Sequence, residues 1–474
     1  MLSAAQLLHG TRRVTIAEHH RLPYAVLDGP SATDCDYLAA PRGAKLLWPA
    51  RSSHEPAPSF AILETADGRS IPIFAAIATD EELAQLRARH GDGWQPAAAL
   101  TSPGGTRLAS VWRAGDGSLC VPFDPDEVCE AYWSERYLQL LAGSRLAFNR
   151  LLMHAYYGVR RGLPRTVQIW LRRRYARVQA RTAFPAWPVE TALHDFFELF
   201  LSWIDEVAGH AVPRIGAWPA PHQWALVLTH DVETAEGVAA IEPVLELERS
   251  LGLRSSWNFV VDRYALDDAL ISELLQDGFE VGVHGVRHDG RDLRSVGELR
   301  RRLPALREAA ERWDAVGFRS PAMHRNWDWM PLLGFDYDAS YPDSDPFEPQ
   351  AGGCCTWLPF FNRDTLELPV TMAQDHTLFE ILRHDDASVW IEKARFLKAR
   401  GGMAQVLTHP DYLVKPRVMD AYRRLLETLA GDESVWKALP REVNAWWRRR
   451  AQTEIVNGHL AGPAAGEAQR HYGA

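Results

Sequence analysis

The chain has 474 residues, of which 46 % are apolar and 24 % charged, a composition typical of globular proteins. This excludes an intrinsically disordered protein, a collagen-like protein and a small disulfide-bonded scaffold, and the length suggests two or three domains. The formal net charge of −9 argues against a nucleic-acid partner, which requires a basic surface. No apolar run approaches the roughly 20 residues that cross a bilayer. The five cysteines show no CxxC spacing and the N-terminus has no signal-peptide pattern, so we expect a cytoplasmic protein.

Residues 1–220 are expected to form an N-terminal α+β domain of unknown role. Its first 140 residues mix short β-like runs with Gly and Pro, and the pattern is helical from about residue 127. The proline-containing segment 216–221 ends this region, because proline disfavours helix and removes a hydrogen-bond donor from a strand. At the other end, residues 451–474 are small, polar and glycine-rich, which predicts a disordered tail.

Residues 145–181 contain ten arginines and no acidic residue. Between the arginines of 165–181, apolar residues recur at roughly helical spacing, at Val167, Trp170, Leu171 and Val178. A helix of this kind can dock on an anionic membrane or an acidic partner. It can equally present a solvated face, and we favour that interpretation because charge runs are common and specific anchors are not.

Residues 221–450 alternate between strand-like and helical patterns. The strand-like runs are short and apolar, at 224–229, 256–261, 279–283, 316–318, 366–368 and 403–407. This alternation predicts an α/β fold, either a (β/α) barrel or a doubly wound parallel sheet. In both architectures the functional groups lie at the carboxyl ends of the strands.

Two predicted strands end in residues that suit metal binding. The first ends at Asp231 and Glu233, which share a face because they are two residues apart. The third is followed by His284 and His288, whose i, i+4 spacing suits one metal ion if the chain turns helically there. Alone, a strand-end aspartate is often a helix N-cap and an HxxxH pair is usually accidental.

Two further strand ends add charged or titratable groups. Arg319 follows the short run at 316–318 and is part of an Arg-Ser-Pro sequence, and His409 follows the last strand. An Arg-x-Pro is usually a turn, and a single histidine is usually structural. The order and placement of all four strand ends on one α/β pattern nevertheless favour a functional site.

These motifs resemble those of the NodB-homology polysaccharide deacetylases, carbohydrate esterase family 4, over about residues 222–450. Residues 229–233 (THDVE) approximate the family's Thr-Phe-Asp-Asp-Gly motif, and residues 284–288 (HGVRH) its His-(Ser/Thr)-x-x-His motif. Residues 319–321 match its Arg-x-Pro motif, His409 its late histidine, and Asp375 the aspartate that precedes this histidine. The resemblance implies a distorted (β/α) barrel with fewer than eight regular units.

The chain departs from the family pattern at two positions. Val232 stands where the family has its second aspartate, and Gly285 stands where it has Ser or Thr. A motif with an acid two positions on resembles a variant of the family, in which Glu233 replaces the missing ligand. The resemblance then implies a divalent metal, Zn²⁺ by preference, on Glu233, His284 and His288.

The resemblance also implies the remaining roles. Asp231 acts as the general base, although it could instead bind the metal while the base lies elsewhere; we favour the base. Arg319 keeps Asp231 ionised, and His409, oriented by Asp375, protonates the leaving amine. The backbone N–H just after Pro321, that of Ala322, would help to stabilise the tetrahedral oxyanion. Trp257 and Trp327 are further substrate-binding candidates because an indole ring can stack on a sugar, although such rings are usually core.

The expected function is that of a metal-dependent hydrolase of non-peptide carbon–nitrogen bonds. The resemblance implies N-deacetylation of an amino sugar or polysaccharide in carbohydrate metabolism, with an N-acetylated carbohydrate as the substrate. Two alternatives remain open. One is an amidase acting on a small nitrogenous substrate, and the other is a catalytically silent carbohydrate-binding or scaffold protein.

Overall fold

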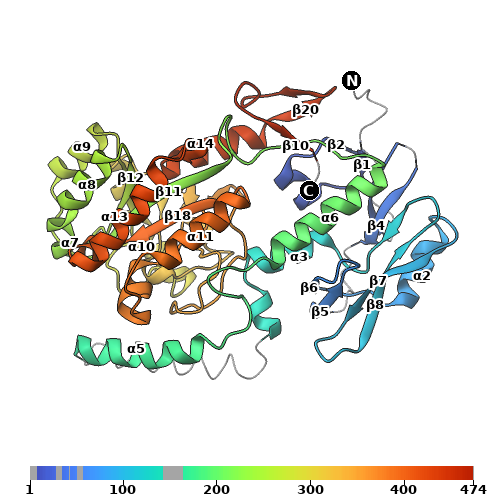
Figure 1. The fold of residues 1–474 in the computed structure, drawn as a ribbon, viewed down its shortest axis with the longest axis horizontal. Helices are drawn as coiled ribbons and strands as arrows, with labels where there is room; N and C mark the ends of the chain where they lie inside the picture. Colours follow the sequence, from blue (N-terminus) through green and yellow to red (C-terminus); the bar gives the residue numbers. More distant parts are fainter. Residues whose placement is uncertain (1–7, 28–34, 42, 51–56, 142–163, 473–474) are drawn as a thin grey trace. The chain divides into compact units, whose positions relative to one another are not determined.

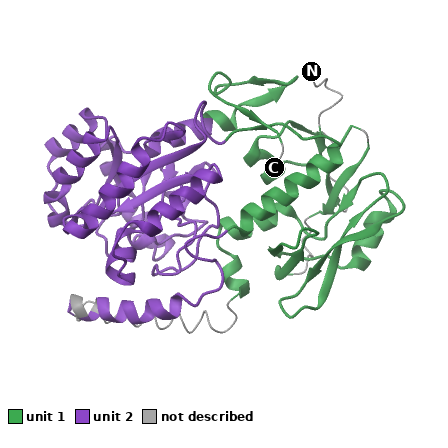
Figure 2. Ribbon diagram, in the orientation of Figure 1, with its two compact units in different colours: residues 1–148, 191–216, 449–474 green, residues 149–190, 217–448 purple. Residues whose placement is uncertain are grey.

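The protein is described by a computed structural model that covers residues 8–27, 35–41, 43–50, 57–141 and 164–472. The chain divides into two compact units (Figure 2). Unit 1 comprises residues 1–148, 191–216 and 449–474, and unit 2 comprises residues 149–190 and 217–448. One crossing falls at Gly216, in the proline-containing break. The predicted ranges 1–220 and 221–450 are wrong in that each unit is discontinuous in sequence, a property that composition along the chain does not report.

Unit 1 is built on a nine-stranded mixed sheet. Its strands follow the order β2 (Tyr24–Val26), β1 (Leu8–Gly10), β3 (Cys35–Ala39), β4 (Lys45–Pro49), β9 (Leu119–Cys120), β8 (Arg107–Arg113), β7 (Gln95–Thr101), β5 (Ser59–Glu64) and β6 (Ser70–Ala75). Its helices are α1 (Thr15–His20), α2 (Asp80–Ala88), α3 (Pro125–Trp133) and α6 (Ala192–Ala208). The α6 helix buries Phe196, Phe197 and Phe200, an i, i+4 stripe that packs against this sheet.

The C-terminal segment is ordered, so the prediction of a disordered tail is wrong. β20 (Glu454–Val456) and β21 (His459–Ala461) form an antiparallel hairpin, and β22 (Arg470–His471) pairs with β10 (Arg214–Ile215). The hairpin turns at Asn457 and Gly458, both with positive φ, and an Asn-Gly pair is a strong hairpin signal. The buried Arg450 lies just before this hairpin. It donates to the carbonyl oxygens of Ile215 and Gly216 and so connects the start of the C-terminal segment to β10.

Unit 2 is built on a parallel sheet. The strands follow the order β17 (Thr365–Glu367), β15 (Tyr337–Asp338), β14 (Gly317–Phe318), β13 (Glu280–Val283), β12 (Ser255–Phe259), β11 (Trp224–Val232) and β18 (Met403–Thr408). β19 (Val435–Lys437) also pairs with β11, and β16 (Phe360–Asn362) adds antiparallel to β17. Every residue of β11 is buried, as expected for a strand covered on both faces.

An irregular segment joins the two ends of this curled sheet. After β17 the chain continues to Val370, whose amide donates to the carbonyl of Tyr341, and to Met372, whose amide donates to the carbonyl of Gln405 in β18. Gln405 in turn donates its amide to Thr371 Oγ1 at 2.9 Å. The architecture is therefore a curled (β/α) half-barrel with irregular hydrogen bonding on one side, in keeping with the expected distorted barrel.

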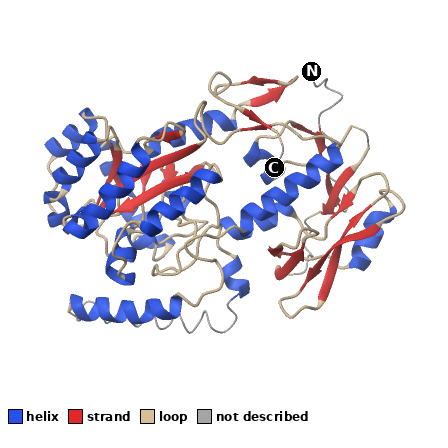
Figure 3. Ribbon diagram, in the orientation of Figure 1, coloured by secondary structure: helices blue, strands red, loops and turns tan. Residues whose placement is uncertain are grey.

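Helices accompany the strands of unit 2 (Figures 1 and 3). They are α5 (Arg165–Gln179), α7 (Ala235–Ala239), α8 (Ile241–Ser250), α9 (Asp268–Gln276), α10 (Val296–Arg312), α11 (Ser388–Ala399), α12 (Pro410–Leu413), α13 (Pro416–Ala430) and α14 (Pro440–Ala451), with short turns η3 (Pro321–Met323), η4 (Met330–Leu333) and η5 (His376–Leu382). The α13 helix buries Val418, Tyr422 and Leu425, so its apolar face is turned inward. Among the described residues, no helix has the length and apolar character required to cross a bilayer.

Candidate metal centre

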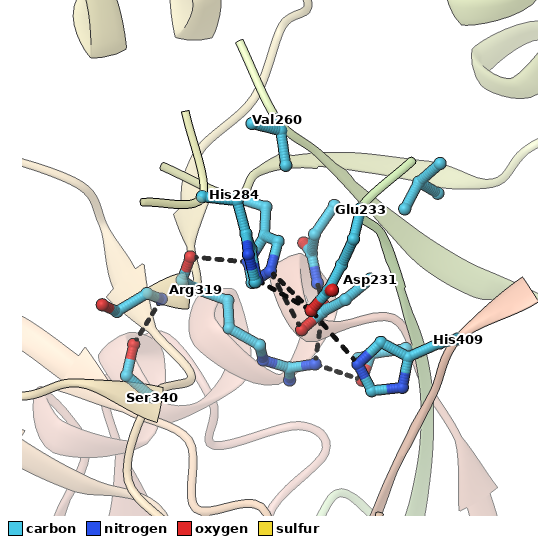
Figure 4. A network of polar contacts seen from close by, with 12 residues as sticks. Asp231, Glu233, Val260, His284, Arg319, Ser340 and His409 are labelled. Carbon is cyan, nitrogen blue, oxygen red and sulfur yellow. Dashed lines mark hydrogen bonds and ion pairs between the residues drawn. The ribbon is translucent and has the colours of Figure 1, made fainter. Parts of the chain in front are cut away.

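The parallel strands of unit 2 deliver polar side chains to one edge of the sheet. Asp231 lies near the end of β11 and Glu233 directly follows it, while His284, Arg319 and His409 directly follow β13, β14 and β18. Figure 4 shows these side chains converging on one point. The convergence follows from the sheet, because the carboxyl ends of parallel strands lie at the same edge.

Two of these groups and His288, which lies four residues after His284, are close enough to share one metal ion. Ligand atoms of Glu233, His284 and His288 all lie within 4.8 Å of one another. Glu233 Oε1 is 2.8 Å from His288 Nε2 and 3.9 Å from His284 Nε2. Both Nε2 atoms are buried and make no hydrogen bond, which leaves them available as ligands. Two imidazole nitrogens and one carboxylate are a donor set that Zn²⁺ accepts at sites with an open fourth position.

The tautomer of His284 is set by the backbone. Its Nδ1 lies 3.0 Å from the carbonyl oxygen of Arg319, so Nδ1 carries the proton and donates it to that carbonyl. The lone pair of Nε2 then points toward Glu233. Burial raises the pKa of the Glu233 carboxyl, but the electrostatic attraction of the neighbouring His288 outweighs it and holds the pKa well below its usual value.

The two histidines approach through a tight loop rather than a helical turn, so the helical expectation is wrong. Gly285 has φ 70° and His288 has φ 50°, both in the left-handed region. A Cβ at Gly285 would lie 2.5 Å from both Asp292 Oδ2 and Pro321 Cγ, so only glycine fits there. Arg302 of α10 donates to Asp292 Oδ1 at 2.8 Å and so anchors the loop.

Asp231 is buried beside the three candidate ligands and is oriented through one oxygen. Its Oδ1 accepts from Asn258 Nδ2 at 2.9 Å and from Arg319 Nη1 at 3.3 Å. Its Oδ2 lies 3.6 Å from His284 Nε2. Burial raises the pKa of Asp231, but the electrostatic attraction of the neighbouring His284, Arg319 and His409 and the Asn258 hydrogen bond outweigh it and lower the pKa. Asp231 is therefore a carboxylate with one oxygen facing the candidate ligands.

Asn258 is the site residue that sequence reasoning missed. It lies in β12, where its backbone is in register with Asp231. Its side chain fills the space over Gly282, since a Cβ there would lie 2.1 Å from Asn258 Oδ1. The sequence signal that could have identified it was an amide side chain inside the strand-like run at 256–261.

His409 and Asp375 form the expected carboxylate–imidazole pair. Asp375 Oδ1 lies 2.7 Å from His409 Nδ1, and the other side of the ring, Nε2, lies 3.6 Å from Glu233 Oε1. Burial lowers the pKa of His409, but Asp375 and the other nearby carboxylates outweigh it and raise the pKa to about 10. The imidazole is therefore a cation at neutral pH.

Arg319 is fully buried, and its contacts connect several strand ends. Its Nε donates to the carbonyl of Ala339 at 2.8 Å and its Nη1 to Thr229 Oγ1 at 2.8 Å. Three residues later the backbone turns sharply, because Ala322 and Met323 have φ values of 54° and 53°. That the backbone at Pro321 and Ala322 stabilises an oxyanion stays a prediction.

The two tryptophans expected to contact substrate differ in how deeply they are buried. Trp257 is fully buried and stacks on His230 with ring centroids 4.1 Å apart, so it belongs to the core and the expectation for it is wrong. Adjacent residues of a strand alternate between faces, and Trp257 points away from the face of Asn258. Trp327 is half-buried and stacks on Phe360 at the β16 edge of the sheet, with centroids 6.2 Å apart. A role for Trp327 in substrate binding stays a prediction.

Val232, which lies between Asp231 and Glu233, is buried. Its Cγ1 lies beside Gly237 of α7, 3.6 Å from the position that a Cβ on that glycine would occupy. The alternation along β11 explains this, because Asp231 and Glu233 share one face and Val232 takes the other. In this chain the two acids of the first motif therefore lie two positions apart.

No protein-family model matches the chain, and no curated protein matches its sequence. Its structure is similar to that of a protein assigned as a polysaccharide deacetylase from Mycobacterium smegmatis, with 19 % identity over 49 % of this chain and 93 % of that one, at a TM-score of 0.41. It is also similar to an allantoinase, with 17 % identity over 49 % of this chain and 92 % of the other, at a TM-score of 0.41. A third similar structure is a family 4 carbohydrate esterase from Streptomyces lividans, with 14 % identity over 45 % and 92 % of the two chains and a TM-score of 0.31.

Proposed function

We propose that the protein is a metal-dependent hydrolase of non-peptide carbon–nitrogen bonds, and that it removes the acetyl group from an N-acetylated amino sugar or polysaccharide. The observation that carries this proposal is the cluster of Glu233, His284 and His288, whose ligand atoms lie within 4.8 Å of one another. A buried carboxylate, Asp231, and a buried imidazolium, His409, flank this cluster on the same edge of the sheet. Amide hydrolysis needs an activated water, a base and an acid, and this arrangement supplies residues suited to each task.

Glu233, His284 and His288 would hold the divalent cation, Zn²⁺ by preference. When bound there, such a cation polarises an acyl carbonyl and lowers the pKa of water to about 7. Asp231 would accept the proton of the attacking water through Oδ2, since Asn258 and Arg319 already donate to Oδ1. His409 would give its Nε2 proton to the departing amine, while Asp375 keeps the ring oriented through Nδ1.

The alternative, in which Asp231 is a ligand, predicts a different result for one substitution. An Asp231→Asn variant keeps an oxygen that can accept hydrogen bonds from Asn258 and Arg319, but it loses the carboxylate that would act as the base. If Asp231 is the base, this variant retains bound metal and loses activity by about 10²–10⁴-fold. If Asp231 is a ligand, metal content falls together with activity.

Metal analysis of the purified full chain tests the proposal first. We expect about one divalent ion per chain in the wild type and loss of that ion in His284→Ala. The control is His384→Ala, which removes a histidine that belongs to no candidate metal cluster among the described residues. Unchanged metal content in His284→Ala, or no bound metal in the wild type, would contradict the proposal of a metal-dependent hydrolase and favour a catalytically silent binding protein.

Acetate release then identifies the substrate class. The metal-loaded chain is incubated with chito-oligosaccharides and, separately, with simple small amides. We expect acetate from the chito-oligosaccharides, abolished in His284→Ala. Hydrolysis of the small amides alone would instead identify an amidase that acts on a small nitrogenous substrate.

A further inference from the structure

Helix α5 exposes the apolar side chains that an amphipathic helix normally packs against its own protein. Trp170 is 55 % exposed, Val178 60 % and Val167 38 %. Among the described side chains of α5, the buried ones are Ala176 and Gln179, on the opposite side of the helix. Figure 1 shows α5 at the margin of unit 2. Solvation alone does not explain this placement, because an exposed tryptophan and two exposed valines on one helix face gain nothing from water.

Arginines share this face. Arg174, Arg177 and Arg181 are exposed; helical spacing places Arg174 and Arg177 among the three apolar side chains, and Arg181 follows the last turn of α5. We call this set the α5 outer face: Val167, Trp170, Arg174, Arg177, Val178 and Arg181. The Arg174 guanidinium lies over the Trp170 ring, 5.3 Å from its centroid. None of the three arginines forms an ion pair with a described residue, and the sequence holds no acid between Glu135 and Glu190.

The other side of α5 is fixed to unit 2. Arg172 Nη2 donates to the carbonyl of Phe347 at 3.0 Å, and Arg173 Nε donates to the carbonyl of Glu380 at 2.8 Å. Arg172 lies on the side of the helix away from Val178 and Trp170, and Arg173, three residues after Trp170, lies beside the outer face. The described arginines of this segment are therefore of two kinds. Arg172 and Arg173 hold the helix in place. The three arginines of the outer face are exposed and pair with no described acid.

We propose that the α5 outer face docks on the surface of an anionic lipid bilayer. Arginine guanidinium groups bind lipid phosphates, an indole ring lies at the headgroup level, and valines enter the boundary with the acyl chains. The occupant must satisfy cationic and apolar groups on one flat helix face at once. A nucleic acid would neutralise the arginines but leave the valines without a partner. A second copy related by a two-fold axis would bring arginine against arginine.

Co-sedimentation of the full chain with lipid vesicles tests this inference. The probes are vesicles of phosphatidylcholine and vesicles of an equal mixture of phosphatidylcholine and phosphatidylglycerol. We expect binding to the mixed vesicles only, weakened by salt. The triple variant R174Q/R177Q/R181Q should bind about 100-fold more weakly, since each arginine near an anionic surface contributes about fivefold. Trp170→Ala should also weaken binding.

The matched control removes the same charge elsewhere in unit 2. R301Q/R312Q/R363Q changes three exposed arginines on other elements, each of which is paired with an acid. This variant should bind mixed vesicles about as well as the wild type. Equal loss in both triple variants, equal binding to both kinds of vesicle, or no binding to either would overturn the inference. Tighter binding to a single-stranded oligonucleotide than to mixed vesicles would also overturn it. The readout does not depend on hydrolytic activity.

Discussion

Asp375 holds His409 with both of its carboxylate oxygens. Oδ1 lies 2.7 Å from the ring Nδ1, and Oδ2 accepts the backbone N–H of His409 at 2.8 Å. Asp375 is fully buried, so this carboxylate acts at short range with little screening by water. The pair fixes the orientation of the ring and keeps it protonated, which are the two properties that a general acid needs.

Asp375→Asn should therefore lower kcat by about 10²–10⁴-fold and change KM little. Burial lowers the pKa of His409, and Asp375 raises it, to about 10 overall. An acid works only while protonated, so wild-type activity should fall as the pH rises through about 10. Without the aspartate charge, burial dominates and this alkaline limb should move to lower pH. A pH profile of kcat/KM for both proteins checks this, and an unmoved alkaline limb in the variant would show that His409 is not the acid.

Gly285→Ser should disrupt the loop that carries the two histidines, although serine is the residue that the resemblance favours at this position. Its Cβ would lie 2.5 Å from Asp292 Oδ2 and Pro321 Cγ, and its φ of 70° strains any side chain. We expect a loss of about 1–3 kcal/mol in the free energy of unfolding. Metal affinity should fall at least tenfold, measured by titration of metal into apo-protein.

Gly252→Ser separates crowding from backbone strain in that experiment. Gly252 has φ 65°, almost the same as Gly285, but a Cβ there meets nothing within 4 Å. Its variant should lose only the strain contribution and keep its metal affinity. If Gly285→Ser binds metal as well as Gly252→Ser does, the packing of this glycine does not shape the metal site.

The sequence predicts that Asp231, Glu233, His284 and His409 lie close together, because each strand can be recognised from its own short run of residues. An apolar run of five or six residues predicts a buried strand, and the residue after it must lie at the edge where the other strands end. What each residue then contacts across that edge is a tertiary property. The Asn258 bond to Asp231 arises from strand neighbours 27 positions apart, which periodicity does not report.

Other features of the structure could not be predicted from the sequence, because they depend on contacts between distant segments of the chain. The position of residues 449–472 depends on β22 pairing with β10, more than 250 residues earlier in the chain. Helical spacing identified the apolar stripe of α5, but spacing does not say whether a stripe packs or remains exposed. The assignment of Trp257 to substrate failed for a related reason, since the sequence does not show which face of β12 meets the core.

Removing the metal should destabilise the protein. A ligand that binds only the folded state stabilises it by about 2.7 kcal/mol when present at 100 times its Kd. A chelator should therefore lower the Tm of the wild type and leave the Tm of a His284→Ala/His288→Ala variant unchanged, because that variant has no site to empty. Differential scanning calorimetry checks this. Equal shifts in both proteins would mean that the chelator acts elsewhere.

Glu280 should make the stability of unit 2 depend on pH. Burial raises the pKa of its carboxyl to about 7, although it accepts hydrogen bonds from Tyr337 and from the backbone of Arg441. The folded state then holds this proton more tightly than the unfolded state, whose value is near 4.5. The stabilising contribution is therefore complete below about pH 4.5, and it is lost as the pH rises through 7.

Glu280→Gln removes this titration while it preserves the size of the side chain. The free energy of unfolding of the wild type, measured relative to this variant, should fall by an amount on the order of 3 kcal/mol between pH 4.5 and pH 7.5. Urea unfolding at several pH values measures that difference, and the comparison cancels every other titrating group. Arg441 Nε also lies 3.7 Å from Glu280 Oε1. A difference that stays constant with pH, or that rises with it, would mean that Glu280 is already ionised in the folded protein and that this ion pair outweighs its burial.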